Sequence, residues 1–218
     1  MSRPRLATDA QLLEGTSRAI SRVGPARLTL ADVAAEVGVA PATLLQRFGS
    51  KRGLLLALAS GAVDSVHACF DAVRAAHPSP LDALLAAATE MTRHVHTPEE
   101  MANHLAFLQI DLSDPDFYRL MLENSKRILA GYQALIAEAV EAAELAPCDT
   151  ARLARAVAAI AGGSLIAWAV HREGTAERWV RDDLATLLGP YRMIPKAQIR
   201  NPKPSKSKVS VERRAKRD

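Results

Sequence analysis

The clearest chemistry in the sequence lies at residues 50 and 51, where a serine is followed directly by a lysine. Ser50 is suited to cap the start of a helix, and Lys51 would then lie in the first turn. The unpaired amides of a first turn attract anions, and a neighbouring lysine adds a full positive charge. The pair therefore predicts a binding site for a phosphate group.

The residues before this pair predict two short helices joined by a tight turn. Thr29 and Asp32 have the spacing of a capping pair that opens the first helix. Gly38 stands where the turn needs a left-handed residue, which glycine adopts without steric cost. Pro41 suits the first position of the second helix, because its missing amide hydrogen is no loss there. The stretch from 29 to 55 thus has the shape of a helix-turn-helix.

The second short helix should have one buried and one exposed face. Leu44 and Phe48 are four residues apart, so both would point inward. A helix in this position of a helix-turn-helix enters the major groove of DNA. The side chains left to face outward or along the rim are Ala42, Thr43, Leu45, Gln46 and Arg47.

Residues 24–55 resemble the DNA-binding module of the TetR (tetracycline-repressor) family of bacterial regulators. The resemblance covers about the first quarter of the chain. It implies an all-helical homodimer with a divergent C-terminal domain for ligand binding and dimerisation. The family pattern is matched by Thr29, Val33, Ala34, Gly38, Val39, Thr43, Leu44, Phe48, Lys51 and Leu54.

The resemblance also implies roles for individual side chains. Gln46 is the expected base reader, since its amide can pair with adenine, and Pro41 and Ala42 would press on a thymine methyl group. The side chains expected to hold the DNA backbone are Arg27, Thr29, Thr43, Arg47 and Lys51.

The sequence departs from the family pattern at three positions. Ala40 replaces the usual serine at the start of the recognition helix, so a side-chain cap is lost. Leu45 replaces a tyrosine and cannot hydrogen-bond a phosphate, although it stays within the expected DNA-contacting set. Gly53 replaces a residue that is often acidic. Arg47 is expected to compensate with a charged phosphate contact.

Composition predicts an all-α fold of about nine helices. Half of the 218 residues are apolar and only 4% are aromatic, while strong helix formers dominate. No run of about 18 uncharged apolar residues is present, and no leader segment opens the chain. We therefore expect a soluble protein of the bacterial cytoplasm, associated with the nucleoid when bound to DNA and with no membrane partner.

Charge divides the chain into three regions. Residues 1–53 carry 8 basic and 4 acidic side chains. Residues 54–194 carry 11 basic and 18 acidic side chains, and residues 195–218 carry 9 basic and 2 acidic ones. We expect a DNA-binding domain at 1–53, a ligand-binding and dimerisation domain at 54–194, and a basic disordered tail at 195–218. The tail is either a solubilising segment or a non-specific DNA tether.

The C-terminal part predicts a dimer interface. A long helix should run from Ser50 to about His77 and connect the two domains. The last two helices, at about 149–172 and 175–188, are rich in small or aliphatic residues. In a monomer these helices would be part of the hydrophobic core. The family resemblance implies instead that they pack against the same two helices of a second subunit in a four-helix bundle.

A ligand pocket is expected among the helices of the body. The candidates combine bulk with a few polar tips, although each taken alone also suits an ordinary core position. They are Met91, His94, Phe107, Met121, Tyr132 and Trp168.

Catalytic and metal motifs are not apparent in the sequence. Cys69 and Cys148 stand alone, and His94 and His96 lie on divergent helix faces. We expect neither an enzyme nor a cofactor or metal site. The expected function is a ligand-responsive transcriptional repressor that binds a palindromic operator as a homodimer and is released by a small-molecule inducer. The alternative is a helical interaction protein whose head no longer binds DNA.

Overall fold

The computed structural model describes residues 7–93 and 95–193, and the regular elements of this part of the chain are helices. It contains nine α-helices and two short 3-10 helices, and no β-strand beyond one isolated bridge between Leu145 and Arg192. The all-α expectation is confirmed. The expected basic tail at 195–218 lies outside the described residues.

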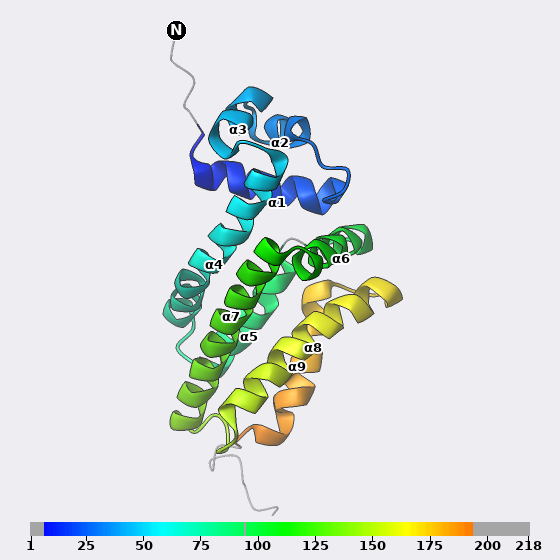
Figure 1. Ribbon diagram of the computed structural model, residues 1–218. Coiled ribbons are helices and arrows are strands. Elements are labelled where there is room, and N and C mark those ends of the chain that lie inside the picture. Colours follow the sequence, from blue (N-terminus) through cyan, green and yellow to red (C-terminus); the bar gives the residue numbers. More distant parts are fainter. Residues whose placement is uncertain (1–6, 94, 194–218) are drawn as a thin grey trace, which may run out of the picture.

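The first three helices form a small head at one end of the molecule (Figure 1). Capping boxes at Thr8 and Thr29 start the first two helices, as their spacing predicts. The bounds are α1 Asp9–Val23, α2 Leu30–Val37 and α3 Pro41–Phe48.

The remaining helices form an elongated body, and α4 runs from the head into it (Figure 1). Within the body α7 lies between α4 and α8, and α9 packs against α8. The bounds are α4 Lys51–Ala76, α5 Pro80–Thr89, α6 Pro98–Ser113, α7 Pro115–Glu141, α8 Thr150–His171 and α9 Ala176–Leu188, with 3-10 helices at Glu90–Thr92 and Gly189–Tyr191.

Two hydrophobic cores hold the molecule together. The body core is built on α4, α5, α7, α8 and α9, and contains an edge-to-face pair of Phe70 and Tyr132 with ring centroids 5.5 Å apart. The head core includes Leu54 and Leu55 of α4 and Phe117 of α7. The core of the head therefore extends past the expected domain boundary at residue 53.

The helices α4 and α8 are long and apolar enough to cross a membrane by length and composition alone. Both pack side by side with other helices of the body, α4 with α5 and α7, and α8 with α7 and α9. A core helix of a soluble protein passes the same test, and 28% of the apolar stretch of α4 and 39% of that of α8 are buried within the chain.

Candidate functional site

The turn between α2 and α3 has the geometry that its residues predict. Gly38 adopts a left-handed conformation with φ 75° and ψ 36°. Leu44 is fully buried on the inner face of α3, and Ala34 of α2 is buried as well. Because these residues fix the rotation of α3, the opposite face is open to solvent. The exposed residues of that face are Pro41, Ala42, Leu45, Gln46 and Arg47, with Thr43 half-buried at the rim.

The start of α3 is open to an incoming group. Ala40 stands at the cap position and makes no side-chain hydrogen bond to the first turn. The free amides of a first turn attract an anion through their partial positive charge. The missing serine thus leaves the start of α3 available to a phosphate without a competing side chain.

The start of α4 lies beside α3 and is held by both of its polar residues. The Gly53 amide donates to Ser50 Oγ at 3.0 Å, which closes the cap. Lys51 Nζ donates to the carbonyl oxygen of Pro25 at 2.7 Å, so the lysine reaches across to the turn between α1 and α2. A Cβ atom at position 53 would clash with the Phe48 carbonyl oxygen. Gly53 therefore allows the close approach of α3 to α4.

The two expected backbone-binding arginines already have partners within the head. Arg47 Nη1 donates to the Ala7 carbonyl oxygen at 2.7 Å and to Asp9 Oδ1 at 2.8 Å. Arg27 Nε donates to the Val23 carbonyl oxygen at 3.1 Å.

Thr29 is committed to its cap. The Thr29 hydroxyl donates to Asp32 Oδ2 at 2.6 Å, and this bond is the main cause that lowers the pKa of Asp32. Arginine and lysine have further donors that can reach a phosphate while these contacts persist, whereas the threonine hydroxyl has one proton to give.

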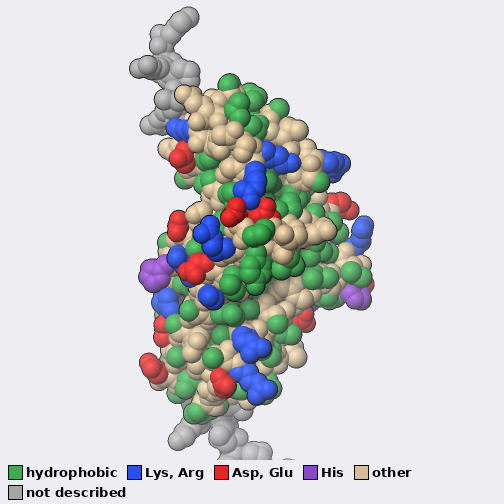
Figure 2. Space-filling model, viewed as in Figure 1, with side chains coloured by type: hydrophobic (Ala, Val, Ile, Leu, Met, Phe, Trp, Pro, Cys, Tyr) green, Lys and Arg blue, Asp and Glu red, His purple; other side chains and the backbone are tan. Residues whose placement is uncertain are grey.

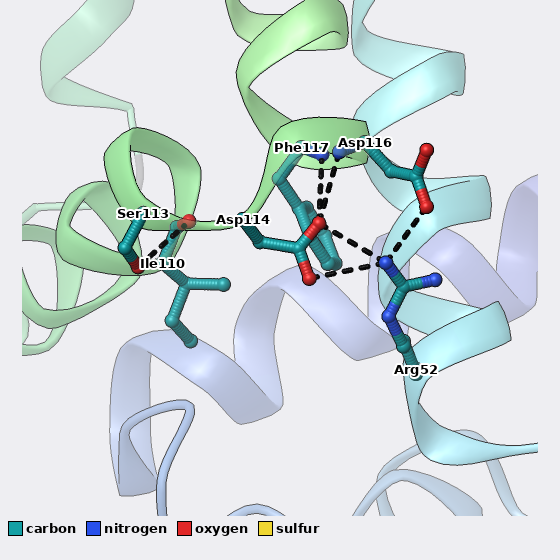
Figure 3. Close-up of polar contacts among 6 residues, drawn as sticks. All are labelled: Arg52, Ile110, Ser113, Asp114, Asp116 and Phe117. Carbon is teal, nitrogen blue, oxygen red and sulfur yellow. Dashed lines mark hydrogen bonds and ion pairs between the residues drawn. The ribbon is translucent and has the colours of Figure 1, made fainter.

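An ionic clamp joins the head to the body, and sequence reasoning missed it (Figure 3). Arg52, in the first turn of α4, donates from Nη2 to both oxygens of Asp114 at 3.0 Å and to Asp116 at 2.8 Å. Asp114 also caps α7 by accepting from the amides of Asp116 and Phe117. The hydrogen bond from Arg52 is the main cause that lowers the pKa of Asp114. The only signal in the sequence was the run Asp114-Pro115-Asp116, which is typical of the start of a helix.

Beneath this clamp the aromatic ring of Phe117 enters the head core. The Phe117 side chain is 2% exposed, and the Arg52 guanidinium lies over its ring at 5.7 Å from the centroid. The ring also meets Phe107 of α6 edge-on at 6.0 Å. The first turn of α7 is therefore part of the head, although the rest of α7 belongs to the body.

A cavity of about 230 Å³ lies close to this junction. The lining residues come from the head helix α1, from the upper part of α4, and from α6 and α7. They are Ser17, Ile20, Leu58, Ala59, Ala62, His104, Phe107, Asp111, Leu120, Met121 and Asn124.

Two polar groups in the cavity lack a partner among the described residues. Asn124 Oδ1 is buried and accepts no hydrogen bond. Asp111 has neither an ion pair nor a hydrogen bond, and burial raises the pKa of its carboxyl group to about 6. His104, by contrast, lies 3.5 Å from Ser21 Oγ through Nε2. Buried polar groups in proteins are normally paired, so these two mark the cavity as a place for a ligand or water.

Of the described pocket candidates, some line the cavity and others lie in the body core. Phe107 and Met121 line the cavity. Tyr132 and Trp168 lie in the body core instead, where Tyr132 is 1% exposed and Trp168 Nε1 donates to the Gly174 carbonyl oxygen. The side chain of Met91 and the whole of His94 lie outside the described residues. Sequence reasoning missed Asp111 and Asn124, because a single polar residue on an otherwise ordinary helix carries no motif.

The head and the body each match a family model. Residues 12–58 match the model of bacterial regulatory proteins of the tetR family. Residues 80–189, half of the chain, match the C-terminal domain of BetI-type transcriptional repressors. The chain belongs to the TetR family. TetR-family proteins are transcription regulators and not enzymes, so the expectations of family and of a non-enzymatic role are confirmed.

Solved structures of transcriptional regulators share the fold. A putative regulator from Saccharomonospora viridis in complex with choline has a TM-score of 0.67 at 18% identity, covering 85% of this chain and 98% of that chain. FadR from Bacillus subtilis in complex with stearoyl-CoA has a TM-score of 0.62 at 14% identity, covering 83% of this chain and 98% of that chain. A TetR transcription regulator from Haloarcula marismortui has a TM-score of 0.63 at 19% identity, covering 85% of this chain and 98% of that chain. None of the curated proteins matches the chain in sequence. At these identities the likeness concerns the fold alone.

We expect Phe117→Ala to loosen the head selectively. Truncating a buried phenylalanine costs about 3–5 kcal/mol, and this ring belongs to the head core. Hydrogen exchange should show amides of α1 to α3 losing protection while amides of α8 keep theirs. The matched control is Phe70→Ala, which removes the same ring from the body core and should expose body amides instead. Identical exchange patterns in the two variants would contradict the division into two cores.

We expect Asp111→Asn to stabilise the protein near neutral pH. The folded-state pKa of Asp111 lies above its unfolded value of 3.8, so the wild type loses stability as pH rises through about 4 to 6. The asparagine does not ionise and therefore avoids that loss. Its free energy of unfolding at pH 7.5 should exceed that of the wild type by about 1 kcal/mol after discounting for partial exposure, which raises Tm by about 2–4 °C. The difference in Tm should fall to about a third of that value at pH 4.5 and vanish only below about pH 3.8. A difference that is constant from pH 4.5 to 7.5 would refute the titration of this carboxyl group.

Proposed function

We propose that this TetR-family regulator is a ligand-responsive repressor that binds a palindromic operator as a homodimer. The observation that carries the proposal is the open face of α3, which lies between the uncapped start of α3 and the Ser50–Lys51 start of α4. Gln46 reads a base edge, and Pro41 and Ala42 contact a thymine methyl group. The backbone is held by Arg27, Thr43, Arg47 and Lys51, with exposed Leu45 beside them. Thr29 joins them when its hydroxyl proton turns from Asp32 to a phosphate.

The existing contacts of Lys51 and Arg47 pre-orient both side chains for this role. The lysine ammonium has three donors, so it can keep the Pro25 carbonyl and still bind a phosphate. The planar guanidinium of Arg47 likewise has donors beyond the one that binds Ala7 and Asp9. Side chains that are already ordered lose less entropy when the phosphate arrives.

For the dimer, we propose that α8 lies at the centre of the interface, with α9 at its side. Hydrophobic side chains gather on the face where α7 and α8 lie in front (Figure 2). On α8, Ile166 is 45% exposed and Val170 is 74% exposed. Cβ atoms added at Gly162 and Gly163 would meet nothing within 4 Å, so packing inside the chain does not require these glycines. Small residues on such a face allow a partner helix to approach closely.

The outer face of α9 is more polar than that of α8. Arg178 pairs with Asp182, and Arg181 pairs with Glu177, each one turn apart. Both pairs are largely exposed and add little stability. In the proposed dimer they would form the polar rim around the apolar centre on α8.

We further propose that an inducer acts at the junction of head and body. A ligand shifts a two-state equilibrium only through different affinities for the two states. The cavity is lined by α1 of the head and by α6 and α7 of the body, so its shape depends on how the head is placed. A ligand that prefers the placement unsuited to the operator would release the DNA. We infer a cytoplasmic, nucleoid-associated location from this role.

The competing proposal is an interaction protein whose head does not bind DNA. It is favoured by the 52% exposure of Leu45, which puts an apolar side chain where a phosphate partner is usual. A gel shift with the DNA that flanks the gene, at two salt concentrations, separates the two proposals. Specific retardation supports the regulator, and the absence of any specific shift supports the interaction protein.

We expect Gln46→Ala and Lys51→Gln to fail in different ways. The first should reduce discrimination against a wrong base by about 1–3 kcal/mol, because it removes a base contact. The second keeps a donor near Pro25 but loses the charge, so it should weaken binding to all DNA sequences alike. It should also reduce the slope of log binding constant against log salt concentration by about 1. Fluorescence anisotropy with operator and scrambled DNA measures both effects. Equal effects of the two variants on operator and scrambled DNA would contradict these roles.

We expect Gly163→Arg to convert the dimer into monomers. The new side chain would project into open space in one protomer but into the facing helix in a dimer. Sedimentation equilibrium should show half the mass of the wild type, with unchanged helical content by circular dichroism. The control is Ala68→Arg on the exposed face of α4, which should remain dimeric. A dimeric Gly163→Arg variant would place the interface elsewhere.

A further inference from the structure

The cavity between α1, α4, α6 and α7 is lined by two residues with a hydrogen-bond acceptor that has no partner among the described residues. The acceptors are the carboxylate of Asp111 on α6 and the Oδ1 atom of Asn124 on α7, which is closed to solvent in this structure and becomes reachable when its side chain rotates. Ser17 and His104 also line the cavity, and His104 lies 3.5 Å from Ser21 Oγ. No lysine or arginine is among the lining residues. An uncompensated carboxylate and a buried amide oxygen both cost free energy until a donor reaches them. The missing group is therefore a donor, and a cation would satisfy both acceptors best.

We infer that this cavity binds a small protonated amine, whose N–H groups donate to Asp111 and to Asn124 Oδ1. The hydrocarbon part of the ligand packs against Phe107, Met121 and Ile20. The inference deepens the proposed function, on which it rests for its regulatory meaning, by naming the chemical class of the inducer. The site lies at the head–body junction and not among the buried residues of the body core.

The chemistry of the lining disfavours other classes of ligand. An anion would meet the carboxylate of Asp111 without a counter-charge. A neutral hydrocarbon would leave both acceptors unpaired in a drier environment than before, which raises their cost. A quaternary ammonium ion has no N–H group to give to Asn124 Oδ1. A protonated amine has up to three donors around one charge, and these suit two acceptors that come from neighbouring helices.

The volume limits the size of the ligand. About 230 Å³ corresponds to roughly eight molecules of liquid water at about 30 Å³ each. Pockets for drug-sized ligands run from about 300 to 1,000 Å³. Benzylamine, which has eight non-hydrogen atoms, is therefore a suitable probe, and benzyl alcohol and benzoate are its neutral and anionic counterparts.

The position of the cavity couples such a ligand to the head. Ser17 and Ile20 belong to α1, and Leu58 and Ala59 belong to the upper part of α4. The ammonium group would sit on α6 and α7, while the hydrocarbon part would touch α1 and α4. A bound amine therefore contacts both sides of the junction and favours one placement of the head over the other.

Calorimetric titration of the full-length protein without DNA tests the inference. Benzylamine should bind at least tenfold more tightly than benzyl alcohol, and benzoate should not bind. Asp111→Asn and Asn124→Leu should each weaken benzylamine binding at least tenfold. Ala62→Phe should abolish it by filling the cavity while keeping both acceptors. Glu141→Gln removes an exposed carboxylate from the far end of α7 and should change nothing.

Several results would overturn the inference. These are no binding of benzylamine, equal binding of benzyl alcohol or benzoate, or full affinity in Asp111→Asn. Circular dichroism confirms that each variant is folded before its titration is interpreted. The outcome is separate from that of the proposed function, because operator binding without amine binding overturns this inference alone. Amine binding that depends on Asp111, in a protein that shifts no DNA, supports the site and overturns the regulator.

Discussion

The structure depends on the insertion of the first turn of α7 into the core of the head. Phe117 is buried there, while Tyr132 and Leu135 of the same helix are buried in the core of the body. A helix that belongs to two cores cannot let one of them move alone. Arg52 reinforces this constraint, because its guanidinium holds the acidic start of α7 against the first turn of α4. Two of the connections between head and body are thus the continuous α4 and the start of α7.

These two connections explain why the cavity is well placed for regulation. It lies between α1 and α4 on one side and α6 and α7 on the other, next to both connections. Asn103 of α6 also donates to the Ser21 carbonyl oxygen of α1 at 2.7 Å, so α6 is hydrogen-bonded to the head. A molecule bound in the cavity would act on the joint itself. The signal would then travel a few ångströms instead of the length of the body.

The sequence predicts the helices well, because their start signals are local. Eight of the nine α-helices in the described part of the chain begin with a serine, threonine or aspartate that accepts a hydrogen bond from the first turn, as at Thr8, Ser79 and Asp149. The exception is Ala40, where the missing cap was visible in the sequence and is present in the structure. The end of α5 is less regular, since the chain changes to a 3-10 turn at Glu90.

Contacts between distant residues could not be predicted in this way. Arg52 and Asp114 are 62 positions apart, and only the fold shows that the two helix starts meet. Arg47 is expected to bind a phosphate, but no pattern in the sequence indicates that it also binds Asp9. The pocket illustrates the same limit. Bulky side chains such as Tyr132 suit a core and a cavity equally, and only the unpaired Asp111 and Asn124 separate the two.

The distance between the two heads of the proposed dimer tests the central constraint most directly. A spin label at Ala35→Cys on exposed α2, with Cys69 and Cys148 replaced by serine, gives one distance per dimer by pulsed electron resonance. The account predicts a narrow distribution for the wild type and a broader one for Phe117→Ala, with both becoming narrow on operator DNA. Equal widths for the two free proteins would contradict the claim that the buried ring of Phe117 holds the head in place.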